Sequence, residues 1–176
     1  QIISCHSLLD LSGLDSIAFI EKSLIIQNNN SLLNFNGLSS LSFIGGNLQI
    51  FQNQKLESTL GIEHLKTIDG ALLIGTFNSH DFGNPVLVSL VGFSGLTWVN
   101  RNFEFVGNDY LVDFSGMEQL KYVGGDLSIG SDYGFYYVGN ESIIDFSGLS
   151  SLDSIGGDLN ILTNPALESL SGLESL

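Results

Sequence analysis

The sequence repeats itself around a glycine that recurs at a nearly constant interval. Successive copies of this glycine are 24, 24, 31, 24, 32 and 24 residues apart, so a 24-residue unit carries insertions in its third and fifth copies. A period of this length is typical of solenoid proteins, in which each unit buries its apolar face against its neighbours. The repeated glycines are Gly13, Gly37, Gly61, Gly92, Gly116, Gly148 and Gly172.

Apolar residues keep constant positions in the unit when this glycine is counted as position 0. They occupy positions −5, −2, +1, +4, +7, +11 and +13. In the clearest copy these are Ile143, Phe146, Leu149, Leu152, Ile155, Leu159 and Ile161. Among the first six units the exception is Thr59 at position −2 of the third. Because Leu60 follows it, we predict that the pattern slips by one residue in this unit.

The pattern favours short strands over helices. A spacing of three resembles one face of a helix, but glycine interrupts every unit and helix propensity is poor throughout. The end of each unit alternates apolar and polar residues, as strands do. Strands of neighbouring units would pair in parallel about 4.8 Å apart. We therefore predict an all-β parallel solenoid with about 24 residues per coil.

We expect the whole chain, 1–176, to form a single solenoid domain, because no linker or charged run divides it. The chain starts and stops within a coil, which predicts that it is a piece of a longer protein. The expected coils are 8–31, 32–55, 56–86, 87–110, 111–142, 143–166 and a partial coil at 167–176.

Composition excludes several partners. The net charge is −14, with only 5 basic residues, whereas nucleic-acid and anionic membrane surfaces require basic patches. No apolar run is long enough to span a membrane. Cys5 is the only cysteine, so no disulfide can form within the chain. We expect no nucleic-acid partner and no direct membrane insertion.

An asparagine precedes the first apolar residue of each unit by three positions. Such a row can form a buried ladder that bonds the backbone of adjacent coils at a turn. Asn29 and Asn140 also fall in glycosylation acceptor patterns, but as ladder members they are predicted to point inward. The ladder consists of Asn29, Asn53, Asn84, Asn108, Asn140 and Asn164.

The repeat resembles the receptor L-domain family, the leucine-rich β-helical module of insulin and epidermal growth factor receptor ectodomains. Similar units occur in fungal cell-wall proteins and in secreted bacterial proteins. The resemblance rests on the combination of Ile-Gly-Gly-Asp-Leu at 155–159 with Asn-Pro-Ala-Leu at 164–167, and it spans nearly all of the chain after Leu8. It implies a right-handed parallel β-helix, a secreted or cell-surface location, and a binding or wall-structural role without catalysis.

The two insertions, 75–83 and 130–139, are the first candidate binding site. Both replace the same short connection two coils apart, so they are predicted to project from one side and to enclose a notch about 10 Å wide. Aromatic-rich loops on a rigid scaffold are typical of recognition sites. Alternatively, these aromatic side chains pack on each other and shield the core. The candidate residues are Phe77, His80, Phe82, Tyr133, Phe135, Tyr136 and Tyr137.

An outward row at position +6 is the second candidate, with Trp98 and Tyr122 as its proposed ligand-binding residues. Four of the five basic residues lie at nearby positions. Exposed aromatic rings beside hydrogen-bonding groups suit stacking on sugars or docking of a protein. Ordinary packing between neighbouring strands explains the row equally simply, and we favour that interpretation. The row contains Phe19, Phe43, Thr67, Trp98, Tyr122 and Ser154.

Catalysis has little support in the sequence. The histidines, His6, His64 and His80, occupy no equivalent corners, and no metal-binding cluster or cofactor motif is present. Asp126 and Asp158 each follow a Gly-Gly pair, where a turn preference explains an acidic residue. We therefore predict no enzyme activity, no metal and no cofactor.

The expected function is a non-catalytic extracellular recognition or adhesion module that binds protein or glycan through insertions 75–83 and 130–139. The alternative is a structural component of a cell wall, surface layer or filament, assembled with other chains through the solenoid ends or an outward apolar row. That row contains Leu9, Leu33, Val88, Val112 and Ile144 and is interrupted by Glu57 and Glu168.

Overall fold

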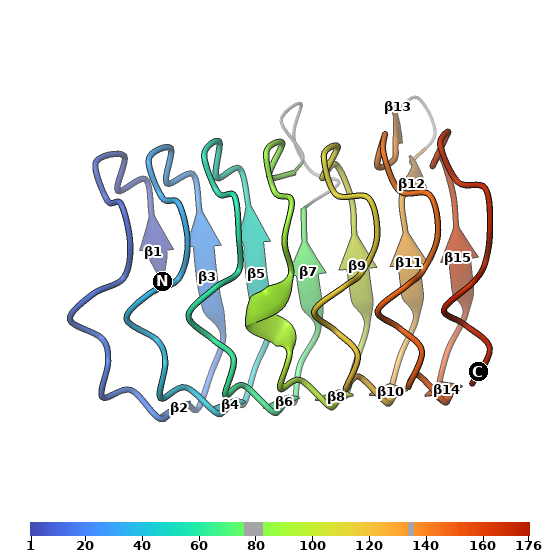
Figure 1. Cartoon of the computed structure of the whole chain (residues 1–176). Coiled ribbons are helices and arrows are strands. Elements are labelled where there is room, and N and C mark those ends of the chain that lie inside the picture. The colour runs from blue at the N-terminus through green and yellow to red at the C-terminus, as the bar shows by residue number, and fades with distance from the viewer. Residues whose placement is uncertain (76–82, 134–135) are drawn as a thin grey trace.

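This computed structural model describes residues 1–75, 83–133 and 136–176. The chain is all-β, with parallel strands in two sheets that run side by side along the molecule (Figure 1). No α-helix occurs in these described segments, and the one helical turn is the 3-10 turn η1 (Val91–Phe93).

The first sheet, which we call the long-strand sheet, has seven strands in chain order. Every strand of this sheet except β1 begins at position +11 of a repeat. They are β1 (Ile2–Ile3), β3 (Leu24–Gln27), β5 (Leu48–Phe51), β7 (Leu72–Ile74), β9 (Phe103–Phe105), β11 (Leu127–Ile129) and β15 (Leu159–Ile161).

The second sheet, which we call the short-strand sheet, has six strands, also in chain order. Each consists of positions +6 and +7 of one repeat. They are β2 (Phe19–Ile20), β4 (Phe43–Ile44), β6 (Thr67–Ile68), β8 (Trp98–Val99), β10 (Tyr122–Val123) and β14 (Ser154–Ile155). Each repeat therefore adds one strand to each sheet.

Strand register survives both insertions. Leu24 pairs with Leu48, one repeat away. Leu72 pairs with Phe103, and Leu127 with Leu159, although these partners are 31 and 32 residues apart in the sequence. The added residues therefore lengthen one connection and leave the stacked strands unchanged. In the second insertion, β12 (Ser131–Tyr133) and β13 (Tyr136–Val138) form a separate antiparallel pair.

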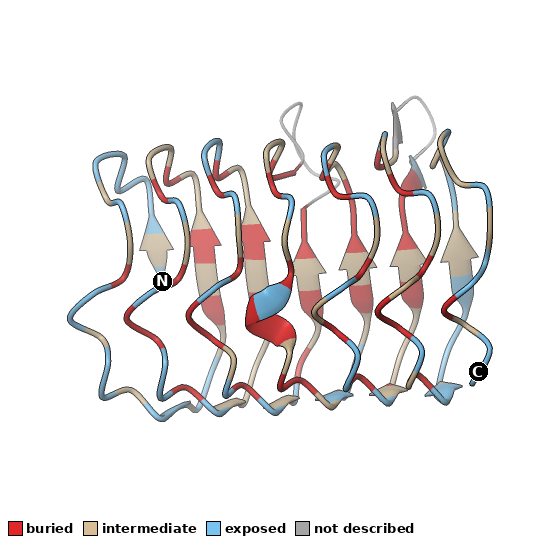
Figure 2. Ribbon diagram, in the orientation of Figure 1, coloured by how far each residue is buried: buried red, intermediate tan, exposed pale blue. Residues whose placement is uncertain are grey.

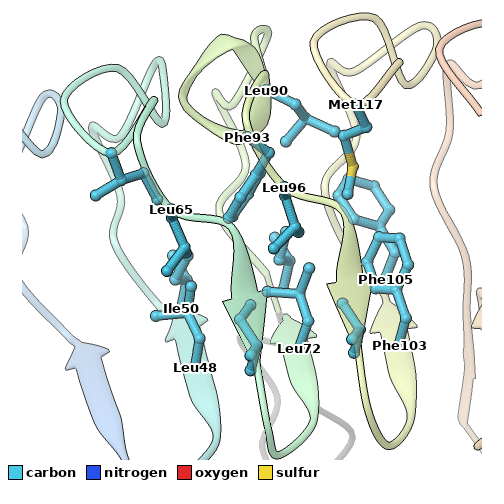
Figure 3. Close-up of a cluster of buried hydrophobic side chains, with 14 of the residues drawn as sticks. Leu48, Ile50, Leu65, Leu72, Leu90, Phe93, Leu96, Phe103, Phe105 and Met117 are labelled. Atoms are coloured by element: carbon cyan, nitrogen blue, oxygen red, sulfur yellow. The ribbon is translucent and has the colours of Figure 1, made fainter. Parts of the chain in front are cut away.

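The inward positions form one continuous apolar core (Figures 2 and 3). In the second to fifth repeats the residues at all seven positions are buried, with exposures of 2% or less. Phe103 and Phe105 lie together in this core (Figure 3), and both rings contact Phe114. Exposure is greater in the outer repeats, and Leu159 in β15 is 41% exposed.

The repeated glycine is required where units stack closely. Gly37 has a φ of +108°, a conformation that L side chains rarely adopt. A Cβ atom there would also collide with the backbone carbonyl of Leu11 in the preceding unit. The sequence period therefore reflects both backbone conformation and the spacing between units.

The predicted one-residue slip at Thr59 is wrong. Thr59 is fully buried at the expected inward position, and Leu60 is 41% exposed. The hydroxyl of Thr59 accepts a hydrogen bond from the backbone N–H of Gly92 at 3.0 Å. Gly92 lies in η1 and, unlike the other repeated glycines, has no positive φ. A polar residue is tolerated in the core because its hydroxyl has this partner.

Candidate functional site

The turn that follows each long strand, which we call the insertion corner, anchors both insertions. Here Gln52 N–H donates to Gly83 O, and Gly107 N–H donates to Gly139 O, both at 2.8 Å. Gly75 lies against Val106, and Gly130 against Leu162, so closely that neither glycine could carry a Cβ. Both insertions therefore leave the stack at the same corner, on either side of the short connection in the fourth unit (Figure 1).

The structure describes only part of the predicted notch. Phe77, His80, Phe82 and Phe135 lie outside the described residues. Tyr133, Tyr136 and Tyr137 belong to the β12–β13 pair, in which the backbones of Tyr133 and Tyr136 face each other. Their side chains also lie outside the description, so the aromatic notch stays a prediction.

The asparagine row lies at the insertion corner and is buried. Asn108 is representative: its Nδ2 donates to the carbonyl oxygens of Ile74 and Val106, both at 3.0 Å. Its Oδ1 accepts from the backbone N–H and the side-chain Nδ2 of Asn84, both at 3.1 Å. Five members are fully buried, and Asn164 is partly buried. Each side chain thus satisfies backbone groups of two units at once.

The glycosylation patterns coincide with this row. The Nδ2 of Asn29 donates to the carbonyl of Ile2 at 2.9 Å, and that of Asn140 to the carbonyl of Phe105 at 3.2 Å. Both side chains are fully buried. Attachment of a sugar would require each amide nitrogen to leave its partners and reach solvent.

The turn between the short and long strands, which we call the groove corner, has a second ladder that the sequence reasoning missed. Its residues lie at position +10, and each side-chain oxygen accepts the backbone N–H of the equivalent residue in the next unit. The bonds are Asn47 N to Ser23 Oγ at 3.0 Å, Ala71 N to Asn47 Oδ1 at 2.9 Å, Asp126 N to Asn102 Oδ1 at 3.1 Å, and Asp158 N to Asp126 Oδ1 at 2.8 Å.

This second ladder is interrupted at Ala71, whose side chain has no acceptor. An open groove of about 640 Å³ lies at the interruption. In the fourth unit, asparagine and arginine replace the Gly-Gly pair of the second, fifth and sixth units. Asn100 Nδ2 donates to Asp69 Oδ1 at 2.8 Å. The groove is lined by Asn47, Asp69, Ala71, Asn100, Arg101, Asn102, Gly124 and Gly125.

The aromatic row at position +6 lies on the outer face of the short-strand sheet, next to this groove. Trp98 pairs with Tyr122 across adjacent strands, and their ring centroids are 5.2 Å apart at 53°. Trp98 is still 46% exposed. The favoured interpretation, packing between neighbouring strands, therefore describes this pair but leaves much of the indole surface open.

One acidic group beside the groove corner is perturbed. Burial raises the pKa of Glu104 above its ordinary value; a hydrogen bond from the Asn102 side chain lowers it, and the negative charge of Asp126 raises it. Glu104 lies in β9 on the outer face of the long-strand sheet, between Leu73 and Ser128.

Many of the acidic side chains accept hydrogen bonds from the backbone of turns, a role that the sequence reasoning also missed. The residue at position −3 accepts the N–H of position −1, as Asp113 does from Ser115 at 2.8 Å. The residue at +2 accepts the N–H of the repeated glycine, as Glu118 does from Gly116 at 2.8 Å. The recurrence of Asp, Asn or Ser at −3 was the available signal. The acidic side chains with such bonds are Asp10, Asp15, Glu63, Asp113, Glu118, Asp145 and Glu174.

The predicted outward apolar row is solvent-exposed. Leu9 and Val88 are 59% and 55% exposed, and Leu33, Val112 and Ile144 are also exposed. Leu33 N–H donates to Leu9 O at 2.9 Å, so the row follows the stack. Glu57 occupies the equivalent position between Leu33 and Val88, to which its backbone is bonded.

His6 and His64 are exposed, and His80 lies outside the description. No group of three metal-ligating side chains gathers within residues 1–75, 83–133 and 136–176. In the same residues, no helix is long and apolar enough to cross a membrane.

No protein-family model, no curated protein and no solved structure with which the chain was compared matches it.

Proposed function

We propose that the chain is a right-handed parallel β-helix of the receptor L-domain type and acts as a non-catalytic extracellular recognition or adhesion module. Its partner is a protein or a glycan at the cell surface, bound through insertions 75–83 and 130–139. The resemblance of the repeat to L domains supports the handedness and the location.

One observation supports the binding role above all: both insertions are anchored at the insertion corner without disturbing strand register. Asn84 and Asn140 directly follow the insertions, and their ladder bonds match those of units without one. A scaffold that holds two long connections on one edge is suited to recognition, because the stack supplies rigidity and the loops supply chemistry. The proposed contacts are Phe77, His80, Phe82, Tyr133, Phe135, Tyr136 and Tyr137.

The test replaces each insertion by the short connection of the fourth unit. Residues 75–83, 130–139, or both would be exchanged for Val106-Gly107, which joins the same strand and ladder positions in that unit. The variants and the unaltered protein are then screened on protein and glycan arrays. We expect the unaltered protein to be monomeric and to bind, and the double replacement to lose binding while it keeps its unfolding midpoint within a small margin.

Point variants sharpen this test. Tyr136→Ala and Phe82→Ala are expected to weaken binding without loss of stability. Full binding by the double replacement would refute recognition through the insertions.

The structural alternative is favoured by the exposed apolar row, Leu9, Leu33, Val88, Val112 and Ile144. If chains assemble along this row, the protein sediments as oligomers or filaments, and Val88→Glu with Val112→Glu restores a monomer. The equivalent Glu57 shows that the stack accepts glutamate at this position. A monomer at all concentrations, before any substitution, would exclude this mode of assembly.

A further inference from the structure

The open groove at the groove corner has the size of a ligand site and a mostly polar lining. Its volume of about 640 Å³ falls within the range of small-molecule sites, roughly 300–1,000 Å³. It exists because Ala71 takes the place of a ladder residue, between Asn47 and Asn102. The groove therefore extends over the second to fifth units, around the one position +10 that carries alanine.

The polar side chains in the groove offer both donors and acceptors. Asn100 and Asp69 are held together by their 2.8 Å hydrogen bond, which orients both groups. Arg101 is exposed, and the equivalent positions on either side of it are glycines, Gly70 and Gly125. Its guanidinium therefore has no neighbouring side chain in its own row.

An aromatic platform continues the groove. The ring of Tyr122 lies over Gly124, because a Cβ on Gly124 would come within 3.1 Å of Tyr122 Cε1. Gly124 lines the groove. Trp98 packs against the same tyrosine and exposes 46% of its surface, two residues before Asn100. A flat exposed ring and a set of planar polar groups thus share one surface.

This combination matches a neutral sugar better than an anion or an apolar peptide. A pyranose has an apolar face that stacks on an indole or phenol ring and hydroxyl groups that both donate and accept. An anion site would consist of donors, whereas Asp69 is an acceptor, and the protein carries a net charge of −14. An apolar peptide would leave the groove amides without partners.

We propose that the groove across the second to fifth units binds a neutral pyranose oligosaccharide, with one sugar ring stacked on Trp98 beside Tyr122. The hydroxyl groups of the bound chain bond Asn100, Asp69 and Arg101. This site lies at the opposite end of the long strands from the insertions (Figure 1) and does not require them.

Trp98 is the only tryptophan, so its fluorescence reports on this site alone. The experiment titrates the unaltered protein with cellohexaose, laminarihexaose, chitohexaose and mannohexaose, and with hexagalacturonate as the acidic counterpart. Calorimetry provides an independent affinity. We expect at least one neutral hexasaccharide to shift the emission and to bind with a Kd of about 1 mM or tighter, and hexagalacturonate to bind more weakly.

Variants that retain Trp98 as the fluorescent reporter test where the sugar binds. Tyr122→Ala, Asn100→Ala and Arg101→Ala are each expected to weaken binding by about three- to tenfold. Ala71→Asn, which fills the groove with a residue used at the same position in other units, is expected to weaken it by about tenfold or more. The matched control is Phe19→Ala with Lys22→Ala, equivalent positions in the first unit, and should leave binding unchanged.

The proposal fails if no neutral hexasaccharide binds, if hexagalacturonate binds more tightly, or if Ala71→Asn and Tyr122→Ala bind as the unaltered protein does. The variant with both insertions replaced separates this site from the insertion corner. Sugar binding that disappears there, but survives in Ala71→Asn, would place the sugar at the insertions, so that the proposed function would stand and this inference would fall.

Discussion

The insertion corner and the groove corner both bond adjacent units through side chains, but they differ in how far the residue type varies. At each corner a side chain accepts a backbone N–H from an adjacent unit. At the insertion corner all six residues are asparagine. At the groove corner the acceptors are the oxygens of Ser23, Asn47, Asn102 and Asp126. Only the first corner is conserved along the chain in residue type.

The difference follows from burial. At the insertion corner the side chain is enclosed, so both its donor and its acceptor need partners, and only an amide supplies both with this geometry. At the groove corner the side chain is partly exposed and only its acceptor bonds the backbone of the next unit, so a hydroxyl, an amide or a carboxylate serves. The groove corner can also lose a member, as it does at Ala71, and the gap becomes a groove.

The largest expected effect is at the insertion corner. Asn108→Ala removes an acceptor and a donor from a fully buried network, and we expect the free energy of unfolding to fall by about 3 kcal/mol. Asn108→Asp should cost at least as much, because a carboxylate cannot donate to the carbonyls of Ile74 and Val106. Urea unfolding of both variants measures the loss, and exposed Asn36→Ala is the control. If Asn108→Asp unfolded with the same free energy as the unaltered protein, the proposed difference between the two corners would be wrong.

At the groove corner, the alanine and aspartate substitutions should differ in their effects on the free energy of unfolding. Asn47→Ala removes the acceptor for Ala71 N–H, and we expect a loss of about 1 kcal/mol. Asn47→Asp keeps the acceptor, as Asp126 does in its own unit, so its unfolding midpoint should stay within about 0.5 kcal/mol of the original. Equal losses in the two variants would show that the amide nitrogen matters here as well.

Completing the ladder is expected to stabilise the stack slightly. Ala71→Asn restores an acceptor at position +10, and we expect a gain of about 0.5 kcal/mol in the free energy of unfolding. Thermal and urea unfolding together measure it. A clear loss of stability would mean that alanine is needed at this corner for packing, and that the groove is a by-product of this requirement.

The smallest expected effect is electrostatic. Because the pKa of Glu104 is raised in the folded protein, folding favours its neutral form. Its contribution is therefore most favourable below its ordinary pKa and declines as the pH rises through the raised value. Glu104→Gln should remove this decline and increase stability at neutral pH by less than about 0.5 kcal/mol, since the side chain is partly exposed. Unfolding of both proteins at a series of pH values from mildly acidic to neutral tests this pH dependence. An unchanged pH dependence in the variant would contradict it.

The parts of the fold that could be predicted are those in which one residue type repeats. The inward apolar positions and the buried asparagines share one requirement in every unit, so periodicity alone revealed them. Thr59 shows the limit: its hydroxyl is accommodated by Gly92 of the next unit, a partner 33 residues away. No local pattern distinguishes that arrangement from a slip toward Leu60.

The candidate site was predictable only in part. Trp98 and Tyr122 were identifiable as neighbours in an outward row, and their contact follows from strand register. The groove beside them was not, because it arises from a missing side chain at Ala71 and from the replacement of two glycines by Asn100 and Arg101. Each of these is a departure from the repeat, and the space that a departure opens depends on the surrounding units.

The sequence by itself determined the unit length, the inward residues and the asparagine row, because each is a local requirement that every unit must meet. The tertiary structure alone decided which acidic side chains bond turns, how the second ladder is connected, and where it opens. These depend on atoms from two or three units that meet only after stacking, and stacking is what brings residues 24 to 32 positions apart into hydrogen-bonding distance.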